Sequence, residues 1–145
     1  MLFRSETCMT FKIQPVPTSS FHQTWPLVEK FLADALKWGE DDYTVEQARA
    51  LLADGRWLLL VAVDEENKIH GAAAVNFFNM PNDRVAFIIA IGGHLVTNKD
   101  TFSQMCTILK SFGATKLQGA ARESIARLWS RFGLKERYRI VEAKI

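Results

Sequence analysis

The stretch RESIARLWSRFGLKERYRIVEAKI, residues 122–145, decides the fold of this chain. Its first half predicts a helix that ends at Gly133, a residue suited to the left-handed conformation of a helix stop. The apolar side chains of that helix recur at helical spacing, at Ile125, Leu128, Trp129 and Phe132. A charged turn then leads into YRIVEAKI, residues 138–145, whose alternating apolar side chains predict a final strand.

Upstream of this stretch, the last third of the chain repeats the alternation of strand and helix. An apolar strand, a glycine break, a helix and a short strand precede the second helix. These segments are VAFIIAI at 85–91, Gly92-Gly93, a helix over 100–112, TKLQGAA at 115–121 and the helix over 123–132.

The first two thirds predict one strand, two helices and two further strands. Thr44 and Gln47 form a capping box at the start of the second helix, and WLLLVAV at 57–63 is a continuous apolar run typical of a central strand. The segments are a strand over 11–16, a helix from Ser20 or Thr24 to Gly39, a helix from Thr44 to Gly55, and strands over 57–63 and 69–78. The predicted order is therefore β-α-α-β-β-β-α-β-α-β, an α/β (α+β) fold.

Composition limits the class of protein. The chain has 145 residues, of which 48% are hydrophobic and 23% charged, so we expect residues 1–9 to form a flexible leader and residues 10–145 a single domain. A net charge of +2 does not favour nucleic acid, and no apolar run reaches the roughly 18 residues of a membrane span. Two distant cysteines and three scattered histidines indicate no metal site, and we expect a cytoplasmic protein.

Only one feature of the residues themselves points to a ligand. The strand at 85–91 leads through Gly92-Gly93 and Lys99 to the start of a helix, whose free N–H groups and partial positive charge suit a phosphate. The alternative is that Asp100 caps those N–H groups itself.

The order of elements and the segment RESIARLWSRFGLKERYRIV resemble the GCN5-related N-acetyltransferase (GNAT) fold, over about residues 10–145. In that family the segment reads approximately Asn-x-x-Ala-x-x-x-Tyr-x-x-x-Gly-Phe and is followed by a strand. Gly133 and Leu134 occupy the Gly-Phe places, whereas Arg122, Ile125 and Trp129 replace Asn, Ala and Tyr. The resemblance implies a mixed central sheet of about six to seven strands flanked by about four helices.

The resemblance also implies an acetyl-CoA-dependent N-acyltransferase acting on a small-molecule or peptide amine. The acyl carbonyl would lie along Ala90, Ile91 and Gly92. The pyrophosphate would lie at Lys99, Asp100 and Thr101. Trp129 occupies the place of the family's general-acid Tyr. The family's base is a carboxylate of the fourth strand, which is missing here, so His94 is the only nearby candidate for the base, and the alternative is a structural role for His94. The implied substrate-binding residues are Trp38, Asp41, Asp42, Asn76 and Asn79.

Three departures from the family pattern support an alternative function. IGGHLVTNKDTFSQM at 91–105 lacks the family's glycine-rich acyl-CoA motif, the fourth strand carries no carboxylate base, and an indole cannot replace the acidic Tyr. The chain also resembles small GNAT-like proteins of tailed bacteriophages and prophages. The alternative is a non-catalytic, virion-associated protein that forms a homodimer or binds a phage structural partner, with a filled cleft and an apolar surface patch.

Overall fold

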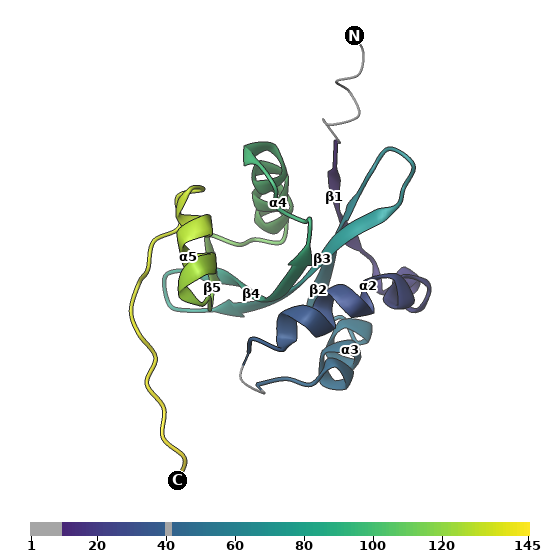
Figure 1. Ribbon diagram of the computed structural model, residues 1–145. Helices are drawn as coiled ribbons and strands as arrows, with labels where there is room; N and C mark the ends of the chain where they lie inside the picture. Colours follow the sequence, from purple (N-terminus) through teal and green to yellow (C-terminus); the bar gives the residue numbers. More distant parts are fainter. Residues whose placement is uncertain (1–9, 40–41) are drawn as a thin grey trace.

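The computed structural model describes residues 10–39 and 42–145 (Figure 1). The elements follow the predicted order up to the last one. They are β1 (Lys12–Val16), the short 3-10 helix η1 (Thr18–Ser20), α2 (Phe21–Leu36), α3 (Val45–Ala53), β2 (Trp57–Val63), β3 (Ile69–Asn79), β4 (Arg84–Gly93), α4 (Lys99–Ser111), β5 (Lys116–Gly119) and α5 (Glu123–Ser130).

The strands form one mixed sheet in the order β1-β2-β3-β4-β5. Strands β1 to β4 pair antiparallel with their neighbours, while β4 and β5 pair parallel. The parallel pair follows from the sequence, since α4 lies between these strands and returns the chain to the same end of the sheet. The α/β (α+β) fold is confirmed, although the described residues contain five strands where about six to seven were expected.

Helices cover both faces of the sheet (Figure 1). One face packs on α2 and α3, through Trp25, Val28 and Leu32 of α2, and the other packs on α4, through Met105 and Leu109. The central strand β2 has buried residues on both faces, as its continuous apolar run predicted. The predicted capping box at the start of α3 is present as well.

The Gly92-Gly93 pair is not a break, which corrects the sequence interpretation. Both residues belong to β4, where Gly92 pairs with Ala72 and Gly93 with Gly71. A Cβ atom on residue 92 would lie 2.3 Å from the backbone oxygen of Phe31. Glycine is therefore needed here because the backbone of α2 crosses directly over β4.

The predicted final strand is also absent. Residues 134–145 contain no helix or strand, and they run away from the body of the protein (Figure 1). The predicted helix stop is confirmed, since Gly133 has a φ of +96° and the N–H of Leu134 donates back to the carbonyl of Trp129 at 3.4 Å. No helix of the described residues is long and apolar enough to cross a bilayer.

Candidate functional site

The parallel strands β4 and β5 separate at one end and form a fork. They pair over four residues only, and the last pair joins Ile88 to Gly119, where β5 ends. Strand β4 continues to Gly93 with β3 as its only strand neighbour in the described sheet. The edge of β4 beyond Ile88 is therefore open on the side of β5.

A bulge in β4 lies at the base of this fork. Between the pairs Ala74–Ala90 and Val75–Ile88, β4 has one residue more than β3, and that residue is Ile89. Beyond the bulge, every second N–H group of an antiparallel strand points away from its partner. The segment expected to polarise an acyl carbonyl thus has a main-chain donor on the open edge.

Apolar side chains from α4 and α5 fill the fork. The indole of Trp129 lies against Gly119, and the rings of Phe102 and Phe132 stack with centroids 5.1 Å apart. A cavity of only about 10 Å³ remains, roughly the space of one water molecule. It is lined by Ile88, Ile91, Val96, Phe102, Met105, Leu117, Trp129, Phe132 and Leu134.

The amino end of α4 is capped by its own side chains. Asn98 Oδ1 accepts a hydrogen bond from the N–H of Thr101 at 2.9 Å, and Thr101 Oγ1 accepts from the N–H of Asn98 at 3.2 Å and of Thr97 at 3.0 Å. Thr101 is only 1% exposed, so its hydroxyl belongs to the cap. The alternative of a self-capped helix end is confirmed, but the N-cap residue is Asn98 and not Asp100.

Lys99 and Asp100 form the exposed first turn of α4. Within the described part of the chain, the main-chain N–H groups of Lys99 and Asp100 donate no hydrogen bond. The side chain of Asp100 is engaged, since its Oδ2 accepts a hydrogen bond from Gln104 Nε2 at 2.9 Å. Two N–H donors and the Lys99 ammonium are therefore what this helix end offers to an anion.

The two residues expected to be catalytic lie in different surroundings. His94 follows β4 directly and is exposed. Its main-chain N–H donates a hydrogen bond to the main-chain carbonyl of His70 at 2.8 Å. Trp129 is partly buried in the fork. Within residues 10–39 and 42–145, no aromatic contact or hydrogen bond joins their side chains.

Of the described residues expected to bind the amine, Trp38 and Asp42 follow α2, and Asn76 and Asn79 lie on β3. Trp38 follows α2 and stacks under the Arg122 guanidinium at 3.9 Å from the ring centroid. Asp42 borders an open depression beside Tyr43, whereas Asp41 lies outside the described residues.

The two expected asparagines differ in their surroundings. Asn76 lies within β3, opposite Trp57 on β2 and Phe87 on β4. Asn79 Oδ1 accepts a hydrogen bond from Arg84 Nη1 at 3.1 Å, across the β3–β4 turn.

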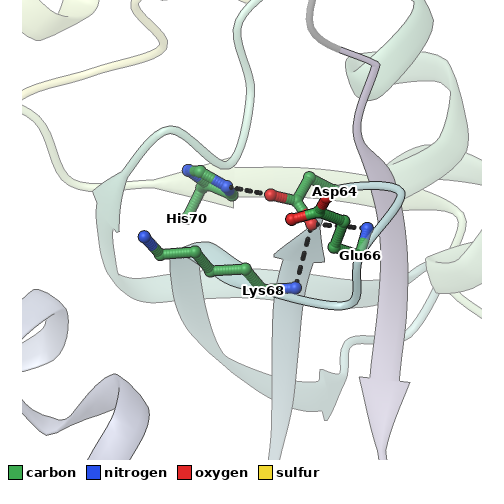
Figure 2. Close-up of polar contacts among 4 residues, drawn as sticks. All are labelled: Asp64, Glu66, Lys68 and His70. Atoms are coloured by element: carbon green, nitrogen blue, oxygen red, sulfur yellow. Dashed lines mark hydrogen bonds and ion pairs between the residues drawn. The ribbon is translucent and has the colours of Figure 1, made fainter.

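Sequence reasoning missed one well-ordered polar cluster, at the β2–β3 turn (Figure 2). Asp64 Oδ2 accepts from His70 Nε2 at 2.8 Å, and Asp64 Oδ1 accepts from the N–H groups of Glu66 and Lys68 at 2.8 and 3.0 Å. These bonds, the one from His70 above all, lower the pKa of the Asp64 carboxyl. An Asp and a His six residues apart around a polar turn were the signal available in the sequence.

No protein-family model and no curated protein sequence matches this chain. Solved structures do match it over nearly its whole length. The aminoglycoside acetyltransferase meta-AAC0020 from an uncultured soil metagenomic sample, in complex with trehalose, has a TM-score of 0.66 and 12% identity, covering 93% of this chain and 95% of its own. The ribosomal-protein-alanine N-acetyltransferase from Brucella melitensis biovar Abortus 2308 has a TM-score of 0.65 and 16% identity, covering 94% and 99%.

The chain has the GNAT fold. A further match is a predicted acetyltransferase from Clostridium acetobutylicum with acetyl-CoA, with a TM-score of 0.59 and 12% identity, covering 93% of this chain and 96% of that one. Identities this low establish the fold alone, so activity and ligands rest on the residues of the site.

The residues of this GNAT fold suit acyl-CoA at the two ends of the fork but not between them. The first turn of α4 suits a pyrophosphate, and the open edge of β4 suits a carbonyl oxygen. The space between is filled by Trp129 and Phe132, so a bound pantetheine arm requires these side chains to move. The helix that carries Trp129, α5, has no fully buried residue and is the element best able to move.

Proposed function

We propose that this protein is an acyl-CoA-dependent N-acyltransferase-like protein that transfers an acetyl group to an amine at the β4–β5 fork. The observation that carries the proposal is the fork itself: β5 ends at Gly119 beside the bulge at Ile89, and the open edge of β4 leads toward the exposed first turn of α4. Solved acetyltransferases with the same fold support it.

Bound acyl-CoA would supply a thioester carbonyl as the electrophile. A main-chain N–H within residues 90–92 would polarise that carbonyl, and Lys99 with the N–H groups of residues 99 and 100 would bind the phosphates. Thr101 is not among these donors to a ligand, because the helix cap uses its hydroxyl.

Proton transfer has one candidate base. The exposed imidazole of His94 would accept the proton of the attacking amine, alone or through water. Trp129 occupies the fork and cannot protonate a leaving thiolate, because an indole N–H donates a hydrogen bond but is too weak an acid to give up its proton. The thiolate would therefore take its proton from solvent.

The amine substrate would be a cation that binds near the end of α2. Asp42 would supply negative charge, and Trp38 an exposed aromatic surface. One solved structure with this fold is an aminoglycoside acetyltransferase in complex with sisomicin, which supports an amine of this class. Asn76 and Asn79 hold places in the sheet and its turn, so we assign them no direct role.

Isothermal titration of the full chain with acetyl-CoA tests the proposal. The Lys99→Ala variant should bind up to about fivefold more weakly, because an exposed ion pair with a phosphate contributes up to roughly 1 kcal/mol. Lys110→Ala, at the other end of the same helix, is the matched control and should bind like the unchanged chain. Trp129→Ala should bind more tightly, because it clears the fork. Absence of binding by the unchanged chain and by Trp129→Ala at millimolar ligand would refute the proposal.

One observation favours a second candidate function, a non-catalytic protein that binds other proteins, for example in phage assembly. The fork is filled, and the α4 end is capped by Asn98 and Thr101. This candidate requires that neither the unchanged chain nor Trp129→Ala binds acetyl-CoA, so the same titration separates the two. A cytoplasmic location suits both candidates, since two cysteines far apart in the sequence favour a reducing compartment.

A further inference from the structure

The segment 138–145 has the sequence of a sheet strand but leaves the body of the protein (Figure 1). Its large apolar side chains are among the most exposed in the described residues: Tyr138 is 65% exposed, Ile140 80% and Val141 91%. Tyr138 and Ile140 would lie on one face of an extended strand, and Val141, Ala143 and Ile145 on the other. Apolar residues on both faces are typical of a strand that is covered from both sides.

The sheet has two outer edges, at β1 and at β5. The free side of β1 is partly engaged, because Gln104 bonds the main chain of Ile13 and Phe11. Pro15, also in β1, has no N–H. The edge of β5 is therefore the one that such a strand can extend.

Strand β5 is the last strand of the sheet, and it pairs with β4 on one side only. Its other edge therefore presents main-chain N–H and C=O groups that no described strand engages. Apolar side chains also lie on both faces beside this edge, namely Leu117 and Trp129 on the α4 face and Phe87 on the α2 face.

We propose that residues 138–145 of one copy pair with the outer edge of β5 in a second copy of this chain, and that the exchange is reciprocal. The path of the chain favours a second copy over its own β5. Lys116, at the start of β5, lies 3.2 Å from Asp83 and is the main cause of the lowered pKa of that carboxyl, and the charge of Arg137 lowers it further. Arg137 therefore passes close to the start of β5, and the residues that follow extend away from that strand (Figure 1).

The exit of the segment from α5 permits this arrangement. Gly133 lies at the end of the helix with φ +96°, and a Cβ placed there would meet no atom within 4 Å. Leu134 still lines the fork, but residues 135–145 are all exposed, so packing does not fix the direction of the chain beyond Leu134. Reciprocal exchange gives a two-fold symmetric dimer in which each β5 gains a neighbour and each apolar segment is covered. The proposal does not depend on acyl-CoA binding.

The mass of the full chain in solution, by light scattering during size-exclusion chromatography, is the first test. We expect about twice the 16.4 kDa of one chain. The double variant Ile140→Asp with Val141→Asp should have the mass of one chain and an unchanged circular dichroism spectrum. Lys135→Asp, which adds negative charge before the segment but keeps its apolar side chains, should remain a dimer. A single-chain mass for the unchanged protein, or a dimer that survives the double variant, would overturn the proposal.

Crosslinking between differently tagged copies tests the contact itself. In a Cys8→Ser, Cys106→Ala background, Gln118→Cys is placed on one copy and Val141→Cys on the other, and a short bismaleimide is added. We expect a crosslinked pair that carries both tags. If the two cysteines crosslink only when they are on the same chain, the segment covers its own β5 and the proposal is wrong.

Discussion

The indole of Trp129 lies so close to Gly119 that a Cβ atom on residue 119 would come within 2.8 Å of its Cζ3 atom. This contact joins the last residue of β5 to the only helix that follows it in the described chain. It also holds the indole ring of Trp129 in position within the fork. The glycine at the end of β5 and the tryptophan of α5 therefore form one unit, in which the small residue provides the space for the large one.

Gly119→Ala should displace Trp129 and lower the free energy of unfolding by about 1 to 3 kcal/mol, the range for overpacking of a packed site. Denaturant unfolding measures the change. Trp129→Phe, which shortens the ring system, should restore most of the stability in the double variant. Equal losses in the single and double variants would show that the contact with residue 129 is not the cause.

Gly92→Ala should be more damaging, because the added Cβ meets backbone and not a side chain. The backbone oxygen of Phe31 lies 2.3 Å from the position of that Cβ, so α2 must move away from β4. We expect a loss of about 3 kcal/mol or more in unfolding free energy. Gly39→Ala is the control: its Cβ would meet the oxygen of Leu36 at 3.4 Å, an ordinary contact, and should change stability little. Similar losses in both variants would contradict the close crossing of α2.

The order of elements could be predicted because each one is marked locally. The apolar run of β2, the capping box of Thr44 and Gln47, and the polar turn between β2 and β3 each depend on neighbouring residues only. The structure agrees with all three. Local patterns of this kind are sufficient to predict the order of strands and helices up to β5 and α5. That order carried the resemblance to the GNAT fold.

Features that depend on distant partners could not be predicted. Gly92-Gly93 was interpreted as a break because its partner, the backbone of Phe31, is about sixty residues away in the chain. The filled fork depends on where Trp129 and Phe132 meet β4 and β5, which spacing alone does not define. The final segment has the alternation of a strand, but pairing needs an available edge as well as a pattern.

Asn98→Ala should remove the cap of α4. Its side chain accepts the N–H of Thr101 at 2.9 Å, and loss of a capping acceptor typically costs about 1 kcal/mol of stability. Asn98→Asp keeps an acceptor and places a negative charge at the helix start, so it should retain or raise stability. Thermal unfolding of the three proteins checks this, and equal melting temperatures would contradict a capping role for Asn98.

The Asp64–His70 pair should make stability depend on pH in the acid range (Figure 2). Hydrogen bonds lower the pKa of Asp64 in the folded protein below its ordinary value of 3.8, so the unfolded chain binds this proton more readily. The contribution of Asp64 is therefore complete above about pH 4 and is lost as the pH falls through the lower, folded pKa. Asp64→Asn removes the titrating group, so the melting temperature of the unchanged protein should exceed that of the variant near pH 6. That difference should shrink between pH 4 and pH 2.

Glu65→Gln, an exposed neighbour on the same turn, should keep the pH profile of the unchanged protein. A difference that stays constant over this range would show that the ionised carboxylate of Asp64 does not stabilise the turn.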